Sequence, residues 1–161
     1  AALAPAFFPD TAAVFDPEGT ARMLQRLGLA SLTRGASDTV NLYRLVSFQY
    51  VGYVMAYTIR QTGDSAWVEC RYMDSPGKRS IRRGHLSRAA WAQLAAYEAE
   101  WQIWNRSGRG AAWLGLDGGV ILLESVVARQ YRAWSAMTAD PALEQYQSWL
   151  AYQFDLALHP Q

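Results

Sequence analysis

The stretch YVMAYTIRQTGDSAWVECRY, residues 53–72, decides the fold class, because it predicts a β-hairpin. β-branched and aromatic residues fill the runs 53–61 and 66–72, and the glycine-containing turn TGDS separates them. Successive side chains of a strand point to opposite faces, which places Tyr53, Met55, Tyr57 and Ile59 on one face and Val54, Ala56, Thr58 and Arg60 on the other. The fold is therefore expected to be built on an antiparallel sheet.

Four further segments predict the remaining strands, three of them of similar composition and one, residues 79–86, short and basic. They are residues 41–50, 79–86, 120–127 and 131–137. Each is bounded by loop or turn residues, and the last two are separated by the short run ARQ. A sheet of about five to six strands results.

Three segments carry the start and stop signals of helices: the first precedes the strands, the second separates the fourth strand from the fifth, and the third follows the last strand. Asp16 and Pro17 begin the first, which Gly28 ends; Ser87 caps the second; Pro141 begins the third. The second and third are each expected to pack on one surface, because each has a single apolar stripe, formed by Ala90, Leu94, Tyr97, Trp101 and Trp104 and by Leu143, Tyr146, Leu150, Phe154 and Ala157.

This order of elements predicts one α+β domain over residues 1–161, an antiparallel sheet with helices packed mainly on one face. Residues 1–15 are expected to form an extended N-terminal arm. The opening AALAPAFFPD is typical of what remains after cleavage beside small residues. We therefore expect a periplasmic or otherwise exported protein, with a cytoplasmic location as the alternative.

Composition excludes several kinds of site. One cysteine allows no internal disulfide, and two histidines are too few for a closed zinc site. Cys70 alternates with Val68 and Tyr72 on an inward face, where a thiol is usually inert. There is no phosphate loop, no dinucleotide fingerprint and no Gly-x-Ser-x-Gly motif. We expect no cofactor, no metal, no membrane span and no enzymatic activity.

Two carboxylates flank a glycine pair in WLGLDGGVILLE, residues 113–124, and allow two interpretations. In the structural one, Asp117 caps the turn at Gly118, and Glu124 neutralises Arg132 on the next strand. In the functional one, Glu124 and Asp117 are the acid/base pair of a cell-envelope glycan hydrolase. We favour the structural interpretation, because an Asp in an Asp-Gly-Gly turn more often caps that turn.

The basic strand 78–88 also has two interpretations. Its arginines and His85 suit an acidic protein surface, a phosphate or a nucleic-acid backbone. Charge on an edge strand also prevents aggregation. Arg79 and Arg82 fall on opposite faces, so the run cannot serve one surface as a whole. Because the net charge of +1 provides no overall field that attracts polyanions, we do not expect nucleic acid as the partner.

Two of the seven tryptophans are better candidates for an interface than for the core. Trp67 shares a strand face with Glu69 and Arg71, and Trp149 lies about one position off its helix stripe. The predicted partner-binding residues are thus Arg79, Arg82, Arg83, His85, Trp67 and Trp149.

The elements YRL, GLDGGVILLE and YRAW, with a Ser-capped helix between the first two and a closing amphipathic helix, carry a family resemblance over roughly residues 41–158. The chain resembles small exported bacterial α+β proteins, some of which are immunity proteins of secreted antibacterial toxins. The resemblance implies that the shared hairpin positions are structural: Asp117, Gly118, Glu124, Tyr131 and Trp134.

The expected function is that of a periplasmic immunity protein, which neutralises a toxin by direct protein–protein contact. The alternatives are the glycan hydrolase at Glu124 and Asp117, and a weak nucleic-acid-binding module at 78–88.

Overall fold

Twelve elements make up the described part of the computed structural model, which covers residues 4–9, 14, 16–35, 37–49, 53–74, 77–105, 119–137 and 141–158. The helices are α1 (Ala4–Phe7), α2 (Pro17–Arg26), α3 (Arg88–Glu100) and α4 (Pro141–Leu158), with short 3-10 turns η1 (Leu32–Gly35) and η2 (Ile103–Asn105). The strands are β1 (Val40–Gln49), β2 (Val54–Thr62), β3 (Ser65–Met73), β4 (Arg79–Leu86), β5 (Gly119–Val127) and β6 (Gln130–Met137).

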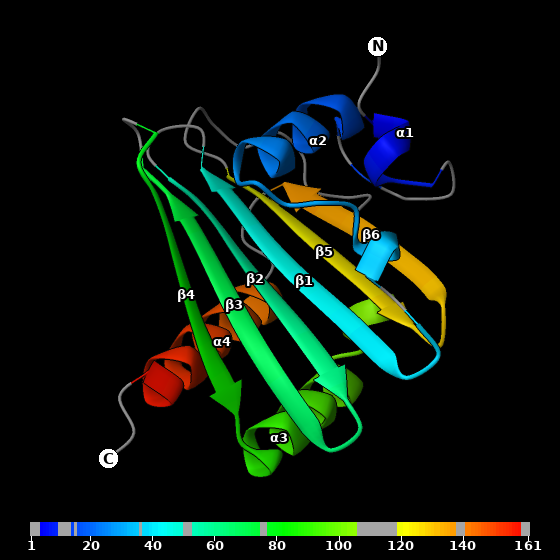
Figure 1. Cartoon of the computed structure of the whole chain (residues 1–161), viewed down its shortest axis with the longest axis vertical. Helices are drawn as coiled ribbons and strands as arrows, with labels where there is room; N and C mark the ends of the chain where they lie inside the picture. The colour runs from blue at the N-terminus through cyan, green and yellow to red at the C-terminus, as the bar shows by residue number, and fades with distance from the viewer. Residues whose placement is uncertain are drawn as a thin grey trace.

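The strands form one open antiparallel sheet in the order β4-β3-β2-β1-β5-β6 (Figure 1). The first four strands form a meander, and the chain then returns past β1 to add β5 and β6 on its other side. The predicted α+β class and strand number are confirmed. The two faces predicted for residues 53–60 are confirmed as well, because Ala56 and Tyr57 belong to separate apolar clusters.

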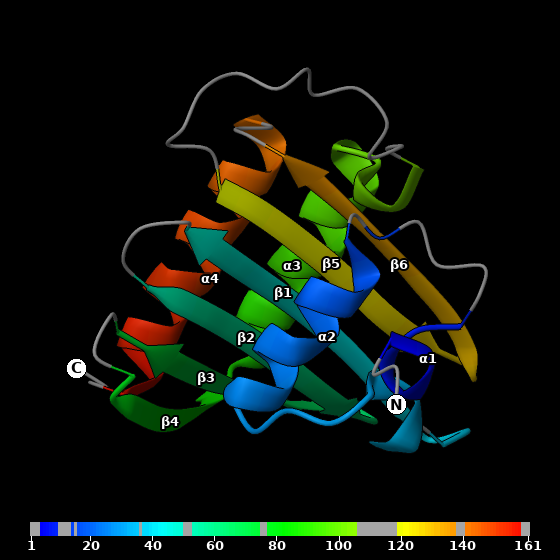
Figure 2. The same ribbon diagram turned by 90° about the horizontal axis from the view of Figure 1, so that it is seen from above.

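Each face of the sheet has its own apolar core. On the α3/α4 face, Leu45, Ile59 and Leu123 pack with residues of the two long helices. On the opposite face, which we call the α2 face, Val46 and Leu122 pack with residues of α1 and α2. Figure 2 shows the two helix layers on either side of the sheet. The long helices therefore share one face, as predicted, but α1 and α2 also cover one end of the other.

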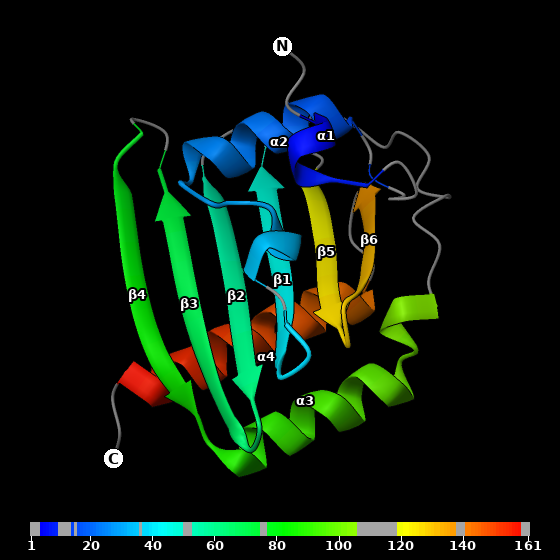
Figure 3. The same cartoon turned by 45° about the vertical axis from the view of Figure 1, so that its right-hand side comes forward.

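The two long helices follow their predicted stripes. Ser87 caps α3 by accepting a hydrogen bond from Ala90 N, and Leu94 is fully buried. On α4 the buried side chains are Tyr146, Leu150 and Phe154, while the side chains of Leu143 and Ala157 lie outside those described. α4 crosses the sheet and packs against β4, as Figure 3 shows. No helix of the described residues combines the length and apolarity that crossing a membrane requires.

The N-terminal segment is packed onto the sheet. Over residues 4–9 the chain forms the helix α1 and buries Phe7 and Phe8 in the core of the α2 face. Glu18 on α2 accepts a hydrogen bond from Ala4 N at 2.9 Å. The expectation of an extended arm is wrong for these residues, because two adjacent phenylalanines bury more apolar surface against α2 than an arm would.

The β5–β6 hairpin has a different register from the one expected. Its loop contains two residues, Ala128 and Arg129, with φ angles of 49° and 62°, as in the tight turns that join twisted strands. Tyr131 therefore pairs with Val126 and Arg132 with Ser125. The prediction of a three-residue loop, ARQ, is wrong. Because the loop is one residue shorter, the pairing of β6 with β5 shifts by one residue, and every side chain of β6 lies on the face opposite to the one predicted.

Candidate functional site

A row of side chains on the α2 face crosses the sheet at one level. The strand pairings place these residues opposite one another in the order Ala133, Glu124, Arg44, Thr58, Glu69 and Arg83. All except Ala133 are polar. From Glu124 to Arg83, the side chains are in turn negative, positive, neutral, negative and positive. Cross-strand neighbours on one face lie close enough to interact, and the contacts form two groups: Glu124 with Arg44 at one end, and Glu69 with Arg83 at the other.

The end of the row at β5 and β1 is closed. Glu124 is 0% exposed, and its carboxylate accepts hydrogen bonds from Arg44 Nη1 at 3.2 Å and from the Tyr131 hydroxyl at 2.8 Å. Burial raises the pKa of Glu124, and the Arg44 guanidinium and the Tyr131 hydroxyl offset part of that rise. Burial and the Glu124 carboxylate raise the pKa of Tyr131, so this tyrosine stays a hydrogen-bond donor.

Glu124 is buried and ion-paired, as the structural interpretation expects, but its predicted partner is wrong. Arg132 lies on the α3/α4 face and is exposed, because the tighter hairpin loop reverses its orientation. Arg44 neutralises Glu124 instead. Glu124 has no exposed surface, and both of its carboxylate oxygens accept hydrogen bonds within the protein. Asp117 and Gly118 lie outside the described residues.

The other predicted structural residue, Trp134, also lies in the core. It is buried on the α3/α4 face. Its indole Nε1 has no hydrogen-bond partner among the described residues.

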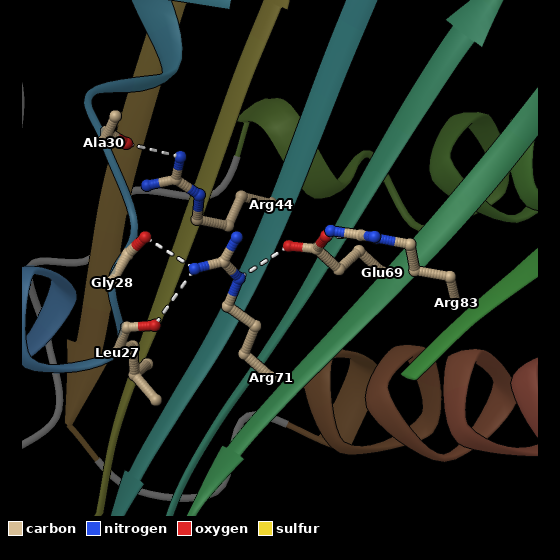
Figure 4. Close-up of polar contacts among 7 residues, drawn as sticks. All are labelled: Leu27, Gly28, Ala30, Arg44, Glu69, Arg71 and Arg83. Atoms are coloured by element: carbon tan, nitrogen blue, oxygen red, sulfur yellow. Dashed lines mark hydrogen bonds and ion pairs between the residues drawn. The ribbon is translucent and has the colours of Figure 1, made fainter. Parts of the chain in front are cut away.

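Two arginines of the α2 face hold the chain segment that follows α2. Arg44 Nη2 donates to the carbonyl of Ala30 at 2.8 Å, and Arg71 Nη1 donates to the carbonyls of Leu27 and Gly28. Figure 4 shows both side chains reaching from their strands toward this segment. A cation at the C-terminal end of a helix also interacts favourably with the helix dipole. These contacts fix α2 over one end of the face.

The opposite end of the row, at β3 and β4, remains accessible to solvent. The Glu69 carboxylate lies between two guanidinium groups, with Arg71 Nε at 2.6 Å and Arg83 Nε at 2.7 Å (Figure 4). Burial raises the pKa of Glu69, but the hydrogen bonds and charges of the two arginines outweigh this effect and hold the pKa below its usual value. Glu69 is therefore a stable anion whose charge is already matched.

A pocket of about 320 Å³ opens beside Glu69. We call it the Thr58 pocket, and its lining residues are Leu42, Thr58, Arg60, Trp67, Val68, Glu69 and Arg83. The Thr58 Oγ1 atom is buried and has no hydrogen-bond partner among the described residues. Trp67 is 55% exposed and meets His85 edge to face, with ring centroids 4.8 Å apart.

The structure brings together four of the six predicted partner-binding residues. Arg79, Arg83, His85 and Trp67 lie on the α2 face of β3 and β4. Arg82 lies on the opposite face of β4, as the alternation of side chains along the strand predicts. Trp149 is half-buried on α4 and packs against the core of the α3/α4 face. The six therefore cannot form one contact surface.

Several residues of this site were missed by the sequence prediction. They are Leu42, Arg44, Thr58, Arg60, Glu69 and Ile81. The alternation on β2 and β3 correctly placed Thr58 with Arg60 and Glu69 with Arg71. Nothing local, however, indicates that Thr58 lies opposite Glu69, because this depends on the register between the two strands.

A second buried carboxylate was also missed. Glu98 on α3 accepts hydrogen bonds from the Tyr146 hydroxyl at 2.9 Å and from Trp104 Nε1 at 3.2 Å. Burial raises the pKa of Glu98, and these two hydrogen bonds lower it in part. The contacts tie α3 to α4 and make Glu98 a structural residue.

Neither a metal site nor a reactive thiol is found in the described residues. They contain no cluster of three or more metal-ligating side chains. Burial raises the pKa of the Cys70 thiol to about 11. A thiol with so high a pKa is almost entirely protonated at neutral pH and is a poor nucleophile.

Comparison with known proteins returns no match: no family model, no curated protein and no solved structure is similar to this chain. Function must therefore be argued from the geometry of the α2 face.

Proposed function

We propose that this chain is a binding protein that engages an acidic surface of a partner protein. The contact surface is the part of the α2 face formed by β3 and β4, which we call the β3–β4 surface: Trp67, Glu69, Arg71, Arg79, Ile81, Arg83 and His85. The observation that carries the proposal is the exposure of Trp67 and Ile81, at 55% and 52%, among cationic side chains. Tryptophan and arginine are the residues most enriched at interface hot spots.

Charge determines the kind of partner. With Arg60 on the adjacent strand, the surface holds four arginines, Arg60, Arg71, Arg79 and Arg83, against one carboxylate, Glu69. The whole chain carries a formal charge of only +1. Positive charge is thus concentrated on this surface, and complementary charge on a partner accelerates association and favours the correct orientation.

Protection of an edge strand explains only part of this arrangement. Arginines on β4 prevent pairing with other chains. Trp67 and Glu69, however, lie on β3, which is inside the sheet. An exposed tryptophan on an inner strand gives no protection and lowers solubility, so a contact with a partner accounts for it better.

The specific form of the proposal is an exported immunity protein that blocks a secreted antibacterial toxin. The resemblance carried by YRL, GLDGGVILLE and YRAW supports it, together with the β3–β4 surface. In this form the protein acts in the periplasm, and the acidic surface belongs to the toxin.

The test is to mix the purified chain with the product of the neighbouring gene and to measure the dissociation constant and rates. Trp67→Ala is expected to weaken the complex about tenfold or more, mainly through faster dissociation. Arg79→Glu should slow association, and more so at low salt. Arg82→Glu is the matched control, because it makes the same charge change on the same strand but on the other face.

The absence of a complex would refute the proposed function, as would a complex that Trp67→Ala and Arg79→Glu leave unchanged. Binding to single-stranded nucleic acid instead, with an affinity that falls steeply with salt, would favour the nucleic-acid alternative.

A further inference from the structure

We propose that the Thr58 pocket receives one carboxylate side chain of the partner protein, held by the Thr58 hydroxyl and the Arg60 guanidinium. This inference rests on the proposed function and specifies the chemistry of its central contact. Thr58 and Arg60 lie on β2, beside the β3–β4 surface.

The Thr58 hydroxyl is a polar group that the described part of the fold leaves without a hydrogen bond. Both oxygens of the neighbouring Glu69 are held by arginines. Arg44, on the other side, binds Glu124 and Ala30 through Nη1 and Nη2, while its Nε is buried without a partner among the described residues. Thr58 Oγ1 is left buried without a partner among the described residues. A buried hydroxyl without a hydrogen bond destabilises a protein, which a valine of the same shape would avoid. A role in binding explains its presence.

The free charge at the pocket is positive. Arg60 is exposed and makes no hydrogen bond or ion pair with a described residue. Arg83 uses its Nε on Glu69. Because the Glu69 anion also lines the pocket, it repels a ligand of high negative charge. A singly charged carboxylate is therefore favoured over a phosphate.

The size and walls of the pocket favour a side chain over a larger ligand. Its volume of about 320 Å³ is near the lower limit of small-molecule sites. Leu42 and the exposed ring of Trp67 provide apolar walls beside the polar groups. A glutamate side chain matches this combination, because its methylenes pack on the ring and its carboxylate pairs with Arg60. The Thr58 hydroxyl is buried in the free protein and has to turn toward the bound carboxylate to donate a hydrogen bond to it.

The experiment uses two small probes, N-acetyl-L-glutamate N-methylamide and its glutamine counterpart. Their binding is followed by NMR, from the backbone amide signals of Thr58 and Arg60 and the indole signal of Trp67. The glutamate probe should shift these signals saturably in the millimolar range, which is the affinity expected of one anchored side chain. The glutamine probe has the same shape without the charge and should bind about fivefold more weakly or worse.

Two substitutions test the assigned residues. Thr58→Val and Arg60→Gln should each weaken the glutamate probe about fivefold. Thr58→Val should leave the melting temperature of the free protein unchanged or raise it, because it removes an unpaired buried hydroxyl. A purely structural threonine would instead lose stability. Thr62→Val, on the same strand but outside the pocket, is the control and should change neither measurement.

The outcomes separate this inference from the proposed function. Equal binding of the two probes, or no shift at Thr58 and Trp67, overturns the carboxylate site. A partner complex that Trp67→Ala weakens but Thr58→Val and Arg60→Gln do not would also overturn it, while the proposed function stands. Binding of the glutamate probe without any partner complex overturns the proposed function and the protein source of the carboxylate.

Discussion

At the scale of single residues, the arginines of the α2 face carry out different tasks. Arg44 is 3% exposed and neutralises Glu124, whereas Arg71 joins Glu69 to the end of α2. Arg60 and Arg83 extend into solvent at the Thr58 pocket. The same residue type therefore holds the fold together on β1 and is available for recognition on β2 and β4.

The buried pair provides the first prediction. Glu124→Gln leaves the Arg44 guanidinium buried without its counter-charge, so the free energy of unfolding should fall by about 3 kcal/mol or more. The double substitution Arg44→Met/Glu124→Leu removes both charges. It should lower the free energy of unfolding by much less than the sum of the losses caused by Arg44→Met alone and Glu124→Leu alone. Urea denaturation of the single and double variants measures both effects. An additive double variant would contradict the pairing.

The second prediction concerns pH and Glu69. Its folded-state pKa is lowered, so its contribution to stability is complete above the unfolded pKa of about 4.3 and is lost as the pH falls through the folded value. Glu69→Gln should therefore have a lower melting temperature than the unsubstituted protein at neutral pH, with the difference shrinking in acid. A difference that does not change with pH would show that the Arg71 and Arg83 contacts do not depend on charge.

At the scale of elements, local sequence determines how each helix begins and ends. Asp16 caps α2 by accepting a hydrogen bond from Gly19 N at 3.0 Å, and Gly28 ends it with a φ of +71°. These start and stop signals can be predicted from the sequence, because a capping side chain and the amide that it binds lie only three or four positions apart along the chain.

Gly19 provides the third prediction. Helix propensity alone favours alanine over glycine by about 1 kcal/mol. A Cβ at position 19, however, would lie 2.1 Å from the Asp16 carboxylate and displace the cap. We expect Gly19→Ala to destabilise the protein, as judged by thermal unfolding. In the background of Asp16→Asn the loss should remain, because that side chain has the same shape, whereas Asp16→Ala should remove most of it. A gain in stability from Gly19→Ala alone would show that the cap is unimportant.

At the scale of the whole molecule, the two faces of the sheet are covered to different extents. The α3/α4 face is packed against the two long helices, while α1 and α2 cover only one end of the α2 face (Figures 1 and 2). Among the described residues, the β3–β4 surface belongs to the part of that face that these two helices leave uncovered. The extent of this surface therefore depends on the N-terminal segment being docked.

That docking provides the fourth prediction. Phe8 is buried in the core of the α2 face, so Phe8→Ala should lower the free energy of unfolding by about 3–5 kcal/mol. An extended arm would tolerate the change within about 0.5 kcal/mol. Phe8→Leu, which keeps most of the apolar volume, is the matched control in chemical denaturation and should cost much less.

The sequence by itself determined the strands, the long helices, the caps of α2 and α3 and the faces of β2, β3 and β4, because these follow from periodicity and from contacts a few residues apart. It also identified Trp67, Arg79, Arg83 and His85 as surface residues of one strand pair. Only the tertiary structure decided the partner of Glu124, which lies 80 positions from Arg44. It also decided that Thr58 lies between Arg44 and Glu69. Such neighbours are set by strand order and register, which depend on how the entire sheet buries its two faces, so no local pattern encodes them.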